Sequence, residues 1–258
     1  MKRLIITYLI FLEMMILVLQ GGYYFKSMFV RSKIDSTNHG WGVVKNKEHR
    51  LPDIPQDEKN MLKAYDGIYS GSPDEKYIYL TIDLGYESGY TKSILDVLRE
   101  NNVKATFFIT LSYMDKNSSL VDRIIQEGHS LQNHTARYKH LDKIDDNAVK
   151  KEIVDLENAI YKRYSIKMRY LRLPYEEWSE RVMKIAKDTG YKTVFWSIAC
   201  VDWTDDKDVS YIYNNVMDNY HNGAVVLLHS VSKSSPEAME LIIKDLKNKG
   251  YKFKALDL

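Results

Sequence analysis

The chain has 258 residues, of which 45% are hydrophobic and 28% charged, and its formal net charge is +2. This length suits one domain of barrel size, and the apolar content with the low net charge excludes a wholly disordered chain. The 37 basic residues barely outnumber the 35 acidic ones, so we expect no nucleic-acid partner. Cys200 is the only cysteine, which excludes an internal disulfide and a multi-cysteine zinc site.

The first element in chain order is an apolar stretch. Residues 4–19 are almost wholly apolar, with Glu13 as their only charged residue. Continued to residue 25, the stretch is long enough to cross a bilayer as a helix, and no small-x-small cleavage site follows it. We therefore expect residues 1–25 to be an uncleaved transmembrane signal anchor that holds the protein on the extracytoplasmic face of a membrane. A buried amphipathic helix is the alternative.

Residues 26–74 differ in composition from residues 75–258. They contain many Ser, Asn and Asp residues and three of the five prolines, which predicts a stalk and lead-in with a short helix at 58–65. From 75 to 258, short apolar runs alternate with longer amphipathic runs, so we expect the folded domain there.

The alternation within 75–258 predicts an α/β fold. Strands that alternate with helices at this spacing form parallel βαβ units, and seven such strands in one domain favour a barrel or a closed-up sheet. We expect strands at 77–82, 104–110, 129–132, 169–173, 192–198, 224–228 and 251–255, and helices at 91–100, 120–127, 147–164, 179–189, 209–220 and 236–249.

Polar side chains stand at the ends of successive predicted strands. Each one alone is most often a helix cap or a satisfied surface group. In a parallel barrel, however, the strand ends share one face, where active sites are assembled. Two acids, two histidines and an arginine at that face predict a general acid/base site. The five residues are Asp83, His134, Arg172, Asp202 and His229.

Several motifs in a fixed order carry a family resemblance. They read TIDLGYE at 81–87, NHT at 133–135, LRLP at 171–174, DW at 202–203 and LLHSVS at 227–232. On these motifs, the chain from about residue 41 onward resembles the polysaccharide deacetylase family (NodB-homology domain). Within the family it is most similar to the delta-lactam-biosynthetic de-N-acetylases of spore peptidoglycan. The resemblance implies a distorted (β/α) barrel of about seven parallel strands.

The resemblance also implies a reaction, the hydrolytic removal of an N-acetyl group from an amino sugar of peptidoglycan, with N-acetylmuramic acid of spore cortex as the expected sugar. Asp83 would be the general base, and Arg172 would keep it ionised and oriented. His229 would be the general acid that protonates the leaving amine, and Asp202 would fix its tautomer and favour its imidazolium form.

Three further residues are candidates for holding the substrate. The backbone N–H of Tyr175 is a candidate donor to the oxyanion. Trp203 and Trp178 are candidates for lining a sugar-binding groove, with plain core packing as the alternative for each. Cys200 we expect to be a buried structural cysteine rather than a nucleophile.

Members of the family hold a divalent metal, such as zinc, with one aspartate and two histidines. Here Leu84 stands at the position of the aspartate and Tyr138 at that of the second histidine, so only His134 remains. A single imidazole is too few ligands for zinc. His140 and Glu87 are the candidate replacements.

These substitutions leave two functions open. In the first, the protein is a peptidoglycan deacetylase that works with a rearranged or absent metal. In the second, it is an inactive deacetylase-like barrel that binds cell-wall glycan or an envelope partner. Both place the protein at a membrane of the bacterial cell envelope or forespore, with a peptidoglycan glycan strand as the expected partner. The sequence identifies no protein partner.

Overall fold

The computed structural model of the chain describes residues 34–45, 48–204 and 207–258. The signal anchor predicted at 1–25 lies outside these residues. No helix within the described ranges is long and apolar enough to span a membrane. Residues 36–258 form one compact unit.

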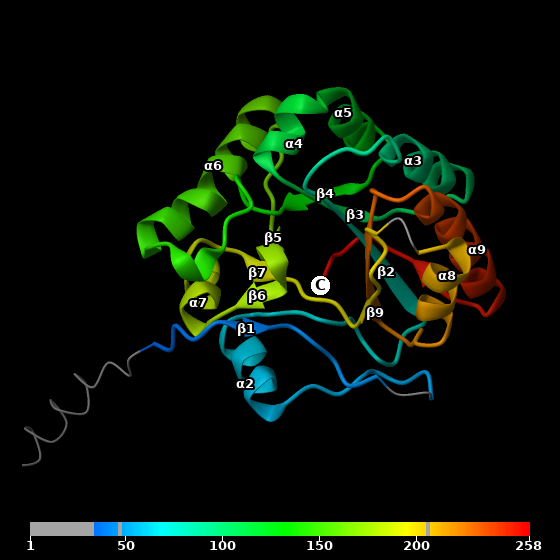
Figure 1. Cartoon of the computed structure of the whole chain (residues 1–258), viewed down its shortest axis with the longest axis horizontal. Helices are drawn as coiled ribbons and strands as arrows, with labels where there is room; N and C mark the ends of the chain where they lie inside the picture. Colours follow the sequence, from blue (N-terminus) through cyan, green and yellow to red (C-terminus); the bar gives the residue numbers. More distant parts are fainter. Residues whose placement is uncertain (1–33, 46–47, 205–206) are drawn as a thin grey trace, which may run out of the picture. The chain divides into compact units, whose positions relative to one another are not determined.

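The centre of this unit is a curled sheet of parallel strands in the order β7-β5-β4-β3-β2-β9-β8, with β10 beside the start of β2. The path ends at β7 and β8 without closing, so the expected barrel is a half-barrel. Figure 1 shows helices along the outer side of the strands. The strands are β2 (Tyr77–Leu84), β3 (Thr106–Ile109), β4 (Ser130–Asn133), β5 (Tyr170–Leu171), β7 (Lys192–Thr193), β8 (Ile198–Ala199), β9 (Ala224–His229) and β10 (Lys252–Phe253).

The predicted alternation of strands and helices is confirmed, with additions. The segment 192–198, expected as one strand, provides two short strands, β7 and β8, at opposite ends of the sheet path. A further helix, α4, precedes α5. The helices of the fold are α2 (Gln56–Ala64), α3 (Thr91–Glu100), α4 (Leu111–Lys116), α5 (Ser118–Gln126), α6 (Asp146–Tyr164), α7 (Glu180–Asp188), α8 (Val209–Met217) and α9 (Ser234–Asn248).

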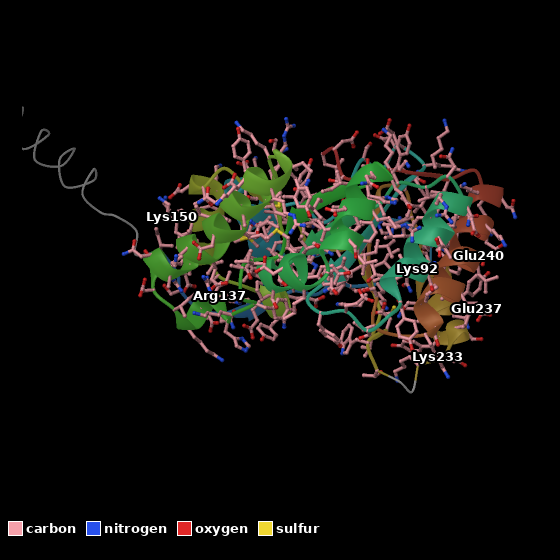
Figure 2. All side chains as sticks on the ribbon, turned by 90° about the horizontal axis from the view of Figure 1, so that it is seen from above. Lys92, Arg137, Lys150, Lys233, Glu237 and Glu240 are labelled. Carbon is pink, nitrogen blue, oxygen red and sulfur yellow. The ribbon has the colours of Figure 1, made fainter. Side chains whose placement is uncertain are left out.

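The helices cover the sheet with amphipathic faces. In α3, Ile94, Leu95 and Leu98 are fully buried, a spacing of three to four residues that forms one apolar face. The polar faces turn outward: in Figure 2, the charged side chains of Lys92 on α3 and Glu240 on α9 project from the surface.

The strand β2 separates two chemical environments. Seven of its eight residues are buried, as expected for a strand covered on both sides. Leu80, Ile82 and Leu84 belong to the large apolar cluster shared with the helices. Because side chains alternate along a strand, Tyr79 and Asp83 lie on the opposite, inner face.

Residues 39–45 and 48–54 belong to the same unit. The strand β1 (His39–Gly40) pairs antiparallel with β6 (Glu177–Trp178). Trp41 is buried and its ring stacks on Phe195 with centroids 4.2 Å apart. Its indole N–H donates to the Trp196 carbonyl at 2.9 Å.

Candidate active site

A cavity of about 480 Å³ lies at the carboxyl ends of the strands. Its walls come from the segments that end or follow β2, β4, β5, β8 and β9, so the strand-end face predicted from the sequence is the face that holds the cavity. The lining residues are Asp83, Gly85, Tyr86, His134, Tyr138, Leu173, Tyr175, Glu176, Trp203, His229 and Val231.

Asp83 and Arg172 form a buried ion pair. The Arg172 Nη1 atom donates to Asp83 Oδ1 at 2.8 Å and to the Thr81 hydroxyl at 2.9 Å. The guanidinium also lies over the ring of Phe108, 4.4 Å from its centroid. Arg172 is 3% exposed and does not line the cavity itself. It therefore affects the cavity only by holding the Asp83 carboxylate in place.

His229 and Asp202 form the second pair. The ring Nδ1 of His229 lies 2.8 Å from Asp202 Oδ1, and the backbone N–H of His229 donates to Oδ2 at 2.7 Å. Burial alone lowers the pKa of His229, but the hydrogen bond and charge of the fully buried Asp202 outweigh it, with Asp83 and Glu176 adding to them. The net result is a raised pKa, which favours the imidazolium form.

The register of the sheet brings the two pairs together. Asp83 on β2 is the direct register partner of His229 on β9, so a carboxylate and an imidazole stand side by side at the strand ends. Arg172 reaches the same place from the end of β5, where its backbone N–H donates to the Asn133 carbonyl of β4.

His134 approaches Asp83 from the other side. Its Nδ1 lies 3.0 Å from the Arg172 carbonyl oxygen, which can only accept, so Nδ1 carries a hydrogen. Burial lowers the pKa of His134 and therefore favours the neutral ring. Its Nε2 is then an acceptor, 3.5 Å from Asp83 Oδ2. Both residues line the cavity, so a single donor on the cavity side, such as a water molecule, can hydrogen-bond to both acceptors.

Tyr138 and Tyr175 meet at the rim of the cavity. The backbone N–H of Tyr175, the predicted oxyanion donor, points at the Tyr138 hydroxyl with a distance of 3.4 Å. Burial, with the nearby Asp83 charge, raises the pKa of Tyr138 to about 12. Tyr138 therefore presents a protonated phenol to the cavity at neutral pH.

Glu176 is a site residue that was not predicted from the sequence. Its Oε1 accepts a hydrogen bond from the Trp196 indole at 2.6 Å. Burial raises the pKa of Glu176, the Trp196 hydrogen bond opposes this, and the charge of Asp83 adds to the rise. No local pattern marks this position, because the groups that surround the Glu176 carboxyl come from other parts of the chain.

The predicted aromatic residues lie in different places. Trp203 lines the cavity, is 46% exposed, and contacts His229 edge-on with centroids 4.9 Å apart. Trp178 is buried, stacks on His39, and is not among the lining residues. Tyr86, like Trp203 and Tyr175, adds an exposed ring to the rim. Cys200 is buried as expected, and burial raises the pKa of its thiol to about 12.

The metal-binding set of the family does not fit this cavity. Leu84 is fully buried in the apolar cluster on the helix side of β2 and has no donor atom. Tyr138 contacts His134 edge-on with a neutral phenol in place of an imidazole. Of the three expected positions, only His134 offers a ligand atom beside Asp83, and one imidazole does not hold zinc.

The two candidate replacements have other partners. Glu87 accepts hydrogen bonds from Gly89 and Thr91 at the start of α3 and from the Tyr113 hydroxyl on α4. The Nδ1 atom of His140 lies 2.8 Å from Glu177 Oε2, and its ring stacks on Tyr175.

One group of side chains in the described part of the chain could hold a metal ion. His140, Asp142 and Glu177 each offer one ligand atom, and these atoms lie within 4.8 Å of one another. One carboxylate oxygen of Asp142 is buried without a hydrogen-bond partner. The group includes neither Asp83 nor His134, so it is separate from the expected ligand positions.

Comparison with known proteins places these features in a family. A sequence model of the polysaccharide deacetylase family matches residues 70–194. The peptidoglycan-N-acetylmuramic acid deacetylase PdaA of Bacillus subtilis is 38% identical over 220 residues, which cover 84% of each chain. A peptidoglycan-N-acetylglucosamine deacetylase of Bacillus cereus is 34% identical and covers 76% of this chain and 72% of its own.

Solved structures agree with the sequence comparisons. The structure of Bacillus subtilis PdaA, a family 4 carbohydrate esterase, superposes with a TM-score of 0.84 at 37% identity and covers 87% of this chain and 97% of its own. A family 4 pseudoenzyme from Bacillus anthracis superposes with a TM-score of 0.70 at 27% identity and covers 74% of this chain and 67% of its own. Similar folds therefore include both active and inactive proteins.

Proposed function

Because this chain belongs to the polysaccharide deacetylase family, we propose that it removes the acetyl group from an N-acetylated amino sugar of peptidoglycan. One observation carries the proposal: two ion pairs converge on one cavity, Asp83 with Arg172 and His229 with Asp202. A base and an acid held beside one another, each with its own supporting charge, are what amide hydrolysis requires.

The base acts on a water molecule. Asp83 Oδ2 and His134 Nε2 are both acceptors 3.5 Å apart, and one water can donate a hydrogen bond to each. The Arg172 guanidinium holds and orients the Asp83 carboxyl through the 2.8 Å hydrogen bond to Oδ1. The water oxygen attacks the acetyl carbon while Asp83 takes one of its protons.

The acid acts on the leaving nitrogen. Asp202 accepts the Nδ1 hydrogen of His229, so Nε2 is the ring atom that faces the substrate. In the imidazolium form, which Asp202 favours, Nε2 carries the second proton. His229 donates this proton to the amine as the C–N bond breaks, and the products are acetic acid and the free amino sugar.

We assign N-acetylmuramic acid as the sugar, and the support is the 38% identity to the Bacillus subtilis deacetylase named for that sugar. We propose the spore cortex as its setting from the resemblance of the motifs to those of the spore peptidoglycan de-N-acetylases. Exposed rings of Tyr86, Tyr175 and Trp203 surround the cavity, and such rings suit the apolar faces of sugars. Among the described residues, His140, Asp142 and Glu177 are the side chains grouped closely enough to hold a metal ion, and no step of the proposed reaction depends on one.

A second candidate function follows from the lost ligand positions. Leu84 and Tyr138 remove two of the three family ligands, and the chain is similar to a pseudoenzyme. If the cavity with its aromatic rim binds glycan without hydrolysing it, this protein is a glycan-binding barrel. Acetate release distinguishes the two functions.

The test uses the full-length protein in detergent and peptide-free glycan strands of alternating N-acetylglucosamine and N-acetylmuramic acid. We expect the parent protein to release acetate, and both Asp83→Asn and His229→Ala to release it about 100-fold or more slowly. Glu240→Gln, on the exposed face of α9 (Figure 2), is the matched control and should equal the parent.

Two outcomes would contradict the proposal. Parent protein that binds the strands but releases no acetate would establish the glycan-binding function instead. Acetate release by Asp83→Asn at the parent rate would refute the assigned base. A parallel assay on an oligomer of N-acetylglucosamine alone tests the sugar, because equal rates on both substrates would contradict the muramic acid assignment.

We also propose that residues 1–25 anchor the protein to a membrane with the domain on the extracytoplasmic side. The support is the apolar sequence of residues 4–19, which suits a bilayer-spanning helix, and the cell-wall substrates named for its relatives.

A further inference from the structure

We propose that Tyr138 is a catalytic residue: its phenolic hydroxyl donates a hydrogen bond to the acetyl carbonyl oxygen and stabilises the oxyanion that forms when water attacks. The inference rests on the proposed deacetylase function. It adds the hydrogen-bond donor to the oxyanion, a role that neither Asp83 nor His229 fills. It gives a positive role to a side chain that, by sequence, is only a missing metal ligand.

The position of Tyr138 supports this role. It lines the cavity together with Asp83, His134 and His229, and its ring contacts the His134 ring edge-on with centroids 4.9 Å apart. His134 Nε2 in turn lies 3.5 Å from Asp83 Oδ2, and these two atoms are the acceptors assigned to the water. The carbonyl group that this water attacks therefore lies in the cavity that Tyr138 lines.

The hydroxyl of Tyr138 has its hydrogen available. Its oxygen accepts the backbone N–H of Tyr175 at 3.4 Å, and within the described residues no hydrogen bond uses the phenolic hydrogen. A phenol is protonated at neutral pH by default. An N–H that donates to the oxygen polarises the O–H bond and makes it a stronger donor, so the Tyr175 N–H acts through Tyr138.

The backbone around Tyr138 is held in a conformation that L-residues rarely adopt. Tyr138 has a φ of 55°, and Tyr175 and Glu176 have φ values of 59° and 58°. Non-glycine residues in the left-handed region cost free energy and cluster at functional sites. Here they occur in the two loops, after β4 and β5, that bring Tyr138 and its Tyr175 partner to the cavity.

The complete reaction balances with side chains of this chain alone. The water oxygen bonds to the acetyl carbon, Asp83 takes the water proton, and the carbonyl π electrons move to the oxygen that Tyr138 hydrogen-bonds. The oxyanion then re-forms its double bond, the C–N bond breaks, and the nitrogen takes the proton of His229. Asp83 returns its proton to His229 through solvent, and Tyr138 keeps its own throughout.

The test is Tyr138→Phe in the full-length protein, which removes only the hydroxyl. Loss of an oxyanion donor lowers kcat about 100- to 1,000-fold, and because the donor acts in the transition state, KM should change less than about threefold. Tyr161→Phe, at an exposed position on α6, is the matched control and should keep the parent kcat and KM.

A binding measurement separates catalysis from structure. Glycan strands should bind to Asp83→Asn and to Asp83→Asn/Tyr138→Phe with affinities within about threefold of one another, as measured by calorimetry, because the hydrogen bond of the phenol is stronger to the oxyanion than to the carbonyl oxygen of bound substrate. A structural role would weaken binding by the double variant and lower the melting temperature of Tyr138→Phe.

Three results would overturn the inference. Parent-like kcat in Tyr138→Phe would refute the oxyanion role while leaving the deacetylase function intact. A kcat loss that weaker binding fully accounts for would make Tyr138 a structural residue. A parent protein that releases no acetate would overturn the inference and the proposed function together.

Discussion

Single residues of the cavity work in pairs whose partners come from distant parts of the sequence. Asp83 is held by Arg172, and His229 by Asp202. In each pair one member lines the cavity and the other is almost fully buried behind it. The buried member orients the exposed one, and Asp202 also raises the pKa of His229, so removal of Asp202 should change the pH dependence of the reaction.

Asp202→Asn tests this arrangement through the pH profile of kcat/KM. The native pKa of His229 is raised, so His229 stays protonated to a higher pH than an ordinary histidine, and activity falls only as pH rises through that raised value. Loss of the Asp202 charge lowers the pKa of His229, and we expect the basic limb of the profile to move to lower pH by about one unit or more. An unchanged basic limb would show that His229 is not the acid.

The sequence allowed the positions of these residues to be predicted but not all of their contacts. Asp83 and His229 end apolar strands, and a parallel fold places such ends on one face. The contacts of Tyr138 and Glu176 depend instead on loops with positive φ at non-glycine residues, which no local sequence pattern indicates. The conformation of these loops also determines which side chains lie near the positions of the lost metal ligands.

At the scale of elements, residues 39–41 brace the loop that follows β5. Trp41 donates through its backbone N–H to the Glu176 carbonyl at 2.9 Å and through its indole to the Trp196 carbonyl. Trp196 in turn donates to the Glu176 carboxylate. One buried tryptophan therefore fixes a wall of the cavity from outside it.

Trp41→Ala should remove this brace. Loss of a buried aromatic side chain lowers the free energy of unfolding by about 3–5 kcal/mol, measured by urea denaturation. Because the Glu176 loop loses its support, we also expect acetate release to fall. Trp203→Ala is the comparison: Trp203 is 46% exposed, so its removal should cost less stability, and equal losses from the two would contradict the brace.

The strand assignments show where periodicity suffices and where it does not. The buried run of β2 and the amphipathic helix α3 agree with their predicted ranges within two residues. The segment 192–198 is expected to be one strand, yet it provides β7 and the first residue of β8, at opposite ends of the sheet path. Apolar content indicates burial, whereas pairing partners are set by the topology of the whole sheet.

At the scale of the whole molecule, the predicted anchor gives a separate expectation. Full-length protein expressed in a bacterium should sediment with membranes, and protease added outside intact spheroplasts should cleave the domain. The apolar stretch at 4–19 is the physical reason. Replacement of Leu9 and Leu12 by lysine should release the protein from the membrane fraction, since charges at the centre of a span are costly. Protection of the domain from protease would contradict the proposed orientation.

In the proposed mechanism, side chains of this chain supply the whole catalytic set, with Tyr138 in place of a metal. The decisive measurement is acetate release by the full-length protein after exhaustive treatment with a zinc chelator, with metal content determined on the same sample. We predict an unchanged rate in chelated protein and no increase on addition of zinc, because Leu84 and Tyr138 offer no ligand beside His134. A rate that falls with chelation and returns with zinc would contradict this mechanism.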